Sequence, residues 1–181
     1  SIDEGNSIFT TTALDLSGNT RDRDISAIPS NVGTGTVDLG AYEAQEEPFP
    51  ANGIIYVNAS VATTGNGFSW DTPFKTLQEA LAVAYAGHQI WVAQGTYYPD
   101  DTDREISFNL IDGVRIYGGF PNYLMGSDDG SFFFRNTATF ETILSGDIGT
   151  VFDESDNSYH VLIANNLSAA SLLDGFTIEE D

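Results

Sequence analysis

Short runs of β-branched and aromatic residues, each ending near a glycine, recur along the chain. The clearest runs are residues 90–95, 114–119 and 142–147, with a weaker copy at 172–178; the glycines that mark them are 24, 27 and 29 residues apart. Such residues favour strands, and glycine marks the bends between them. Because each run is too short to bury its own apolar face, the copies must stack on one another. The pattern predicts an all-β solenoid, a stacked parallel β-helix.

One segment has the period of a helix instead. Its apolar positions share one helical face: Phe74, Leu77, Leu81 and Ala84. This stripe predicts a helix over about residues 73–85, with Asp71 or Thr72 as its cap and Gly87 just past its end. An amphipathic helix directly before the first strand run is expected to cover the open N-terminal end of the solenoid.

The composition changes twice along the chain. Residues 1–44 are rich in Thr, Asp, Gly and Asn, and residues 45–53 contain two prolines without apolar periodicity, which is typical of a linker. A new module is expected from residue 54 to residue 181. Its final strand, at residues 177–181, is followed by no capping helix. The C-terminal rung is therefore expected to be open and to offer a template for strand addition by a neighbouring module or chain.

The charge of the chain limits its partners. The net charge is −21, from 27 acidic residues against six basic ones. Binding to nucleic acid or to an anionic membrane is disfavoured, since both need Lys and Arg against phosphate. The acidity suits salty or calcium-containing surroundings, or simply a solvated exterior.

Three absences from the sequence carry further expectations. The chain has no cysteine, which excludes disulfides, thiolate metal sites and a cysteine nucleophile. It has no apolar run of about 18 residues that would span a membrane. The first residues lack the features of a signal peptide, so a mature chain or a piece of a longer one is expected.

A set of motifs resembles a known family. The motifs are residues 56–59, 64–70, 73–81, 90–97, 116–120, 143–148 and 174–178. They resemble the N-terminal part of right-handed parallel β-helix domains in large secreted and surface proteins of Bacteroidota. Residues 2–6, 14–21 and 37–43 resemble the closing turns at the opposite end of such domains. The resemblance implies the tail of one module, a linker and the head of the next in a tandem array; a circular permutant is the alternative.

Acidic residues in two loops are the candidate ligand set. The predicted calcium ligands are Asp100, Asp101, Asp103, Asp153, Glu154 and Asp156, because one loop could supply several carboxylate oxygens. With Glu105 and Asp147 nearby, the same clusters are also candidates for the paired carboxylates of a glycosidase. Solvated loops are the plain alternative in a chain with 27 acidic residues.

The remaining candidates point to packing. His88 is expected to be exposed or to contact the helix C-terminus, and His160 to be a packed or edge residue of a strand. Lys75 is expected on the helix, away from the rungs, which argues against polysaccharide lyase chemistry. Residues 132–134, three phenylalanines, are expected to close a loop against the solenoid or to contact a sugar or protein, and Trp70 and Trp91 to lie in the core.

Taken together, these features predict a non-catalytic structural or adhesive segment of an extracellular or cell-surface protein. No cofactor other than possible calcium is expected, and the partner is expected to be a surface polysaccharide or another protein module. The alternatives are a carbohydrate-active β-helix enzyme, either polysaccharide lyase or glycoside hydrolase, and a calcium-stabilised carbohydrate-binding module. The fold by itself does not decide between them.

Overall fold

The computed structural model describes residues 5–6, 36–37, 52–150 and 153–179. The chain divides into two units, Ser1–Pro48 and Phe49–Asp181. In the first unit two short strands, β1 (Gly5–Asn6) and β2 (Thr36–Val37), pair antiparallel. Apart from these strands and residues 52–53, the closing turns expected at 1–44 and the linker expected at 45–53 lie outside the described residues.

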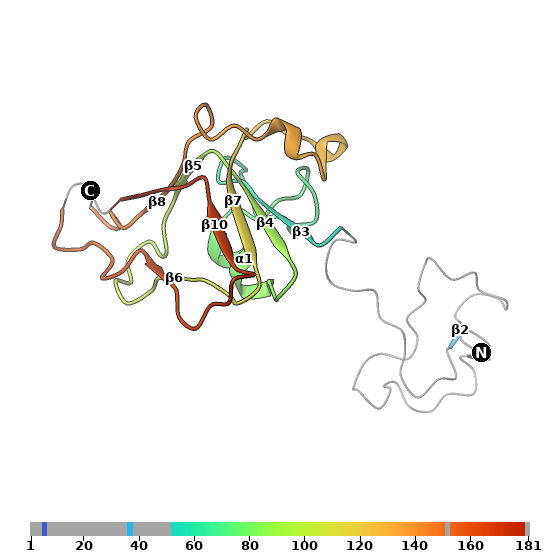
Figure 1. Cartoon of the computed structure of the whole chain (residues 1–181), viewed down its shortest axis with the longest axis horizontal. Coiled ribbons are helices and arrows are strands. Elements are labelled where there is room, and N and C mark those ends of the chain that lie inside the picture. The colour runs from blue at the N-terminus through green and yellow to red at the C-terminus, as the bar shows by residue number, and fades with distance from the viewer. Residues whose placement is uncertain (1–4, 7–35, 38–51, 151–152, 180–181) are drawn as a thin grey trace. The chain divides into compact units, whose positions relative to one another are not determined.

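The strands of the second unit form three parallel sheets (Figure 1). The first sheet has the order β10-β7-β4-β3 and consists of β3 (Ile54–Val57), β4 (Gln89–Ala93), β7 (Arg115–Phe120) and β10 (Leu172–Asp174). The second has the order β11-β8-β5 and consists of β5 (Gly95–Tyr97), β8 (Thr142–Ser145) and β11 (Thr177–Glu179). The third pairs β6 (Phe108–Asn109) with β9 (Leu162–Ile163).

The chain visits these sheets in a fixed rotation. From β4 it passes to β5 and β6, then to β7, β8 and β9, and finally to β10 and β11. Neighbouring parallel strands cannot be joined by a tight hairpin and need a crossover. Here helix α1 lies in the crossover from β3 to β4, and each later crossover is built from strands of the other two sheets. A unit of mostly parallel strands with one helix is compatible with the β-solenoid that the sequence predicts.

The helix is shorter than expected and begins later. Helix α1 (Leu77–Val83) starts after Thr76, whose side chain accepts a hydrogen bond from the Glu79 N–H while the Glu79 carboxylate accepts one from the Thr76 N–H. This capping box, rather than Asp71 or Thr72, sets the first turn. Phe74 cannot belong to the helix because it forms a parallel bridge with Val57. No described helix is long and apolar enough to cross a membrane.

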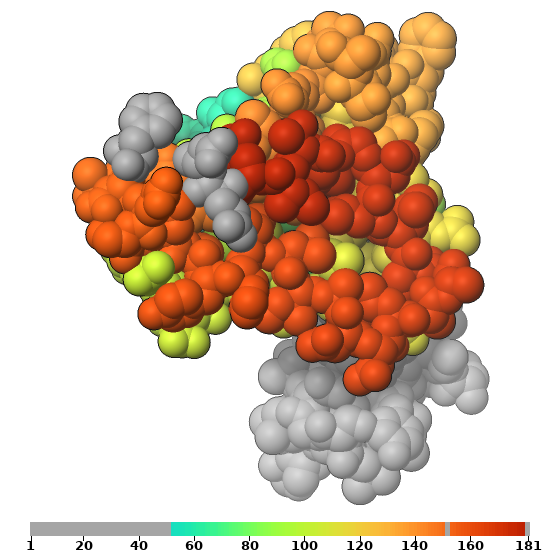
Figure 2. Space-filling view, turned by 60° about the vertical axis from the view of Figure 1, so that its left-hand side comes forward, coloured from blue at the N-terminus to red at the C-terminus, as the bar shows by residue number. Residues whose placement is uncertain are grey.

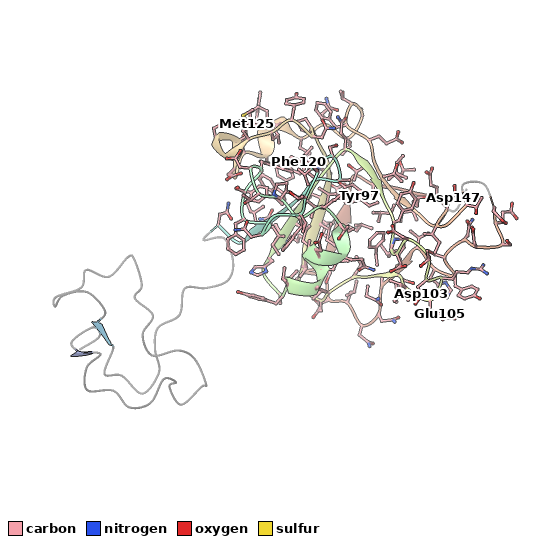
Figure 3. The ribbon with its side chains drawn as sticks, turned by 180° about the vertical axis from the view of Figure 1, so that it is seen from behind. Tyr97, Asp103, Glu105, Phe120, Met125 and Asp147 are labelled. Atoms are coloured by element: carbon pink, nitrogen blue, oxygen red, sulfur yellow. The ribbon has the colours of Figure 1, made fainter. Side chains whose placement is uncertain are left out.

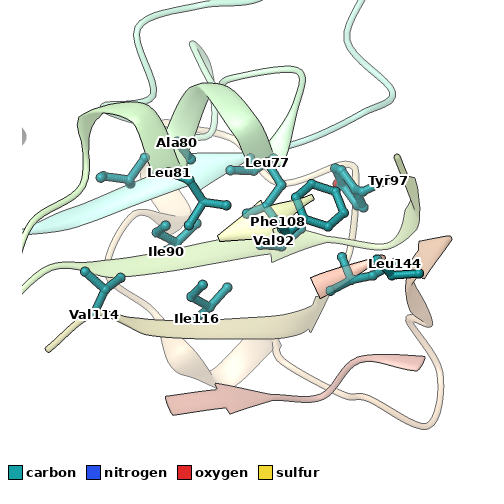
Figure 4. Packing of buried hydrophobic residues seen from close by; sticks show 13 residues of the cluster. Leu77, Ala80, Leu81, Ile90, Val92, Tyr97, Phe108, Val114, Ile116 and Leu144 are labelled. Atoms are coloured by element: carbon teal, nitrogen blue, oxygen red, sulfur yellow. The ribbon is translucent and has the colours of Figure 1, made fainter. Parts of the chain in front are cut away.

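The inner faces of the three sheets and the helix enclose one core (Figure 4). Strand register places Ile55, Ile90, Ile116 and Leu173 on successive strands of the first sheet, as a ladder of aliphatic side chains. Tyr97, Leu144 and Ile178 form the corresponding ladder of the second sheet. Helix α1 adds Leu77, Ala80 and Leu81 to this core. The helix therefore covers apolar side chains of the stack, as the sequence predicts.

The outer face of the first sheet is buried as well. Tyr56 and Trp91 alternate with the inward residues of β3 and β4, and they pack with Trp70 and Phe120 in a second core. The Trp91 and Phe120 rings are stacked with centroids 4.8 Å apart. The loop after β7 contains the 3₁₀ turns η2 (Gly126–Asp128) and η3 (Phe132–Phe134), and Leu124 and Phe134 of this loop pack against the second core. The expectation that Trp70 and Trp91 lie in the core is confirmed, with each side chain 3% exposed.

The predicted pattern of a strand followed by glycine holds at only one of the turns between sheets, the turn from the first sheet to the second. Gly119 and Gly175 follow strand residues of the first sheet where the chain turns toward the second, and their φ angles of 92° and 83° are costly for other residues. The third predicted copy, residues 142–147, is different because its strand, β8, lies in the second sheet. Gly146 therefore follows a strand of the second sheet. The prediction that residues 142–147 are equivalent to residues 90–95 and 114–119 is wrong.

The second-sheet ladder gives a matched test of the stack. Leu144 is fully buried, whereas Ile178, one strand further along the same ladder, is 52% exposed. We expect Leu144→Ala to lower the free energy of unfolding by about 2–5 kcal/mol, because it leaves a cavity in the core. Ile178→Ala should cost less than about 1 kcal/mol. Urea unfolding followed by circular dichroism measures both, and equal losses would contradict the described register.

Candidate functional site: the acidic loops and the Tyr98 groove

The two acidic loops of the sequence are neighbours in the structure. The loop after β5 and the loop after β8 are joined by three hydrogen bonds: Gly149 N–H to Asp101 O at 3.1 Å, Tyr159 N–H to Arg104 O at 3.0 Å, and Arg104 Nε to Asn157 O at 2.5 Å. The Arg104 guanidinium also lies 4.4 Å from the centroid of the Tyr159 ring. In Figure 3, Asp103, Glu105 and Asp147 lie toward the same side of the second unit.

Several of these carboxylates hold their own loops. Asp100 Oδ1 accepts hydrogen bonds from the N–H groups of Thr102 and Asp103, at 2.9 and 2.8 Å. These bonds, first that from Asp103 and then that from Thr102, hold the pKa of Asp100 below its ordinary value. The Ser155 hydroxyl and N–H do the same for the pKa of Asp153. Both groups are therefore ionised at neutral pH.

The other predicted calcium ligands are spread along the same loops. Asp103 accepts a hydrogen bond from the Glu105 N–H at 3.0 Å, and Asp156 accepts one from the Thr150 N–H at 2.8 Å. Asp101 and Glu154 are exposed. Among the described residues, no three His, Asp or Glu side chains form a group that could hold a metal ion. Several of these carboxylates thus accept hydrogen bonds within their own loops without calcium. The calcium site stays a prediction.

Three open hollows meet beside these loops. One is lined by Ala59, Lys75, Thr76, Thr96, Tyr97, Tyr98 and Asp101; the next by Thr76, Gln78, Tyr98, Pro99, Asp100, Asp101 and Ile106; the third by Tyr98, Asp100, Asp101, Asp147, Ile148 and Gly149. Tyr98 and Asp101 line all three. We call this surface the Tyr98 groove.

The position of Lys75 corrects an expectation. Lys75 precedes helix α1 instead of lying on it, and its N–H donates to the Thr64 hydroxyl at 3.1 Å. It lines the Tyr98 groove together with Thr96 and Asp101. The helix starts at Leu77 because of its capping box, and Lys75 lines the same hollow as Thr96 of β5 and the predicted ligand Asp101.

The two histidines lie in different environments. His88 is 6% exposed, its ring lies 3.8 Å from the ring of Tyr85, and its Nδ1 accepts a hydrogen bond from the Tyr85 N–H at 3.4 Å. Burial lowers the pKa of His88. Of the two alternatives expected for His88, the structure shows the contact at the helix C-terminus and not the exposed position. His160, expected to be a packed or edge residue of a strand, is exposed and precedes β9, so the packed position is wrong.

The three phenylalanines differ in their surroundings. Phe132 packs edge-on against Trp91, Tyr117 and Phe120, with centroids 5.1 to 5.6 Å apart. This contact closes the loop against the first sheet, as predicted. Phe133 is 89% exposed.

A further acidic cluster was missed by sequence reasoning. Asp129 accepts a hydrogen bond from the Trp70 N–H at 2.9 Å, and both Asp71 and Asp129 approach Gly126. Burial, together with the nearby charges of Asp71 and Asp128, raises the pKa of Asp129 although the Trp70 N–H opposes the shift. The adjacent acids at 128–129 are visible in the sequence, but the approach of Asp71 depends on the fold.

This cluster predicts a stabilising substitution. A carboxyl whose pKa is raised in the folded state destabilises the fold when ionised, and the loss is complete above its folded pKa. Asp129→Asn removes that charge and keeps an oxygen for the Trp70 N–H. We expect a higher melting temperature than that of the unsubstituted protein at pH 7, and a smaller difference as the pH falls below about 4.

The matched control is Asp103→Asn, an exposed carboxylate in another loop. It should give no such rise at pH 7 in calorimetric scans at both pH values. A lower melting temperature for Asp129→Asn at pH 7 would show instead that the folded protein compensates this charge.

Comparison with known proteins gives a family for the second unit. The family described as "Protein of unknown function (DUF1565)" matches residues 57–181. This family is associated with β-helix proteins, in agreement with the parallel strands of the second unit. No curated protein and no solved structure matches the chain. The match spans well over half of the chain, and the protein therefore belongs to the DUF1565 family of unknown function.

Proposed function

We propose that residues 54–181 form the N-terminal, helix-capped part of a right-handed parallel β-helix in a large extracellular or cell-surface protein of a member of the Bacteroidota. Its role is structural or adhesive, and this segment carries no catalysis. The family match and the fixed rotation of the chain through three parallel sheets support the β-helix. In such an array the apolar ladder of one rung continues into the next.

The open last rung is the observation that carries this proposal. Among the described residues, β9, β10 and β11 each pair with one strand, on the same side of the stack. Leu172 is 42% and Ile178 is 52% exposed, and Leu173 and Phe176 are half-buried. Figure 2 shows residues of this last rung spread over one face of the molecule. Unpaired edges beside apolar side chains are a template for further strands.

We propose that a further parallel rung packs on this open face. An apolar hollow lies at the edge of the stack, lined by Leu110, Val114, Ile116, Leu167, Ser168, Ser171, Leu172 and Leu173. Apolar side chains of a following rung would fill it and extend the ladder that ends at Leu173. The resemblance of residues 1–44 to closing turns adds the tail of a preceding module, which makes the protein a tandem array.

A carbohydrate-active enzyme is the second candidate, and the new position of Lys75 is the observation that favours it. A lyase needs a base near a uronate together with groups that neutralise the carboxylate of the substrate. Lys75 lines a hollow beside Thr96 of β5 and could supply either the base or the neutralising cation. Release of unsaturated uronate products from alginate or polygalacturonate, followed by ultraviolet absorbance, would support a lyase and contradict the structural role.

The open rung predicts self-association of the isolated chain. At about 0.5 M salt, where repulsion between the acidic chains is screened, we expect the average mass to rise with protein concentration. The double variant Leu172→Lys and Ile178→Lys should stay monomeric, because lysine on an exposed edge opposes pairing. Sedimentation velocity measures the mass.

The matched control changes two exposed apolar residues of the loop after β7. Tyr123 and Met125 are 67% and 65% exposed, and the double variant Tyr123→Lys and Met125→Lys should associate like the unsubstituted chain. A monomeric chain at all concentrations, or equal loss of association in both variants, would contradict stacking at the open rung.

A further inference from the structure

We propose that the Tyr98 groove binds an uncharged polysaccharide, with the Tyr98 ring as the platform for a sugar ring. The inference deepens the proposed adhesive role and rests on it. It assigns a binding surface to a side of the stack that the open rung does not use.

The exposure of Tyr98 is the first argument. Along β5 and past its end, side chains alternate, so that Tyr97 points into the core and Tyr98 points out. Tyr97 is 3% exposed and its hydroxyl donates to Ala93 O at 2.9 Å, whereas Tyr98 is 41% exposed. The anchored Tyr97 fixes the backbone that carries Tyr98. An aromatic ring held open in this way offers an apolar face to the C–H groups of a pyranose, while its hydroxyl stays in water.

The hollows around Tyr98 are the second argument. The three hollows are open to solvent and have volumes of about 180, 380 and 290 Å³, so that only the one lined by Gln78 and Ile106 reaches the size range of ligand sites by itself. Since Tyr98 and Asp101 line each of them, the groove runs past both residues in more than one direction. This shape suits several linked sugar units better than a single one.

The walls of the groove are held before any ligand binds. The Gln78 amide nitrogen donates to Pro99 O at 2.9 Å and to Ser107 O at 3.1 Å, which ties helix α1 to the loop after β5. The Asp100 carboxylate is fixed by two backbone N–H groups of the same loop. A pre-organised wall lowers the entropy lost on binding. Thr76, Thr96 and Asp101 add hydroxyl and carboxylate groups that can bond to sugar hydroxyls.

Charge decides which polysaccharide fits. Asp100, Asp101 and Asp147 line the groove, and Lys75 is the one cation among its lining residues. A uronate or sulfated chain would place its charges beside these carboxylates, whereas a neutral chain meets no such repulsion. Carboxylates also accept hydrogen bonds strongly from sugar hydroxyls. The groove therefore favours neutral over anionic polymers.

Affinity gel electrophoresis of the full chain tests this inference. The neutral probes are xyloglucan, galactomannan, arabinoxylan and mixed-linkage β-glucan, and the anionic probes are alginate and polygalacturonate. We expect at least one neutral polymer to retard the protein more than either anionic polymer. Tyr98→Ala should weaken that binding about tenfold or more, and Tyr98→Phe should keep it because the ring remains.

Tyr123→Ala is the matched control, since Tyr123 is an exposed tyrosine outside the groove. It should bind like the unsubstituted chain. The inference is overturned if no neutral polymer is bound, if an anionic polymer is bound more tightly, or if Tyr98→Ala binds normally. Self-association through Leu172 and Ile178 is measured on the same samples. Its persistence in Tyr98→Ala separates a failure of the groove from a failure of the stacking proposal.

Discussion

Register between parallel strands is the constraint on which this structure depends. Ile55, Ile90, Ile116 and Leu173 lie on successive strands of the first sheet, so that each aliphatic side chain covers the next. A shift of one residue on any of these strands would turn its apolar side chains to the opposite face. Both faces of β3 and β4, and most of β7, are buried, one face in each core. Packing in each of the two cores thus specifies the register of these strands.

This constraint also determines where the chain can vary. Strand residues must match their neighbours above and below, whereas a loop that leaves the stack at a corner is not held in a continuous strand register. The loop after β7 uses this freedom to cover the outer face of the first sheet with Leu124 and Phe134. The loops after β5 and β8 use it to form an acidic surface beside Tyr98. Any binding specificity of the stack is therefore expected in its loops.

The local sequence pattern predicted where strands occur better than it predicted which sheet each strand belongs to. The runs at 90–95 and 114–119 are equivalent in the structure, but the run at 142–147 belongs to the second sheet. All three read alike because each is apolar on its inward face and followed by glycine. The helix began later than its apolar stripe suggested, because the Thr76–Glu79 capping box and the Phe74 bridge outweigh the periodicity.

The sequence identified individual residues of the candidate site, but their proximity follows only from the fold. The acids at 100–103 and 153–156 were identified from the sequence, but their adjacency depends on β5 and β8 being neighbours in one sheet. Lys75 beside Asp101, and Asp71 near Asp129, follow from the same stacking. The outward turn of Tyr98 could have been read from its alternation with Tyr97, which is a local signal.

The most direct measurement is of methyl contacts across the first-sheet ladder by nuclear Overhauser effects on methyl-labelled protein. The account predicts contacts from Ile90 to both Ile55 and Ile116, and from Ile116 to Leu173, without a contact between Ile55 and Leu173. If Ile90 contacts only one of its two expected neighbours, or Leu173 lies away from Ile116, the parallel stack described here is wrong.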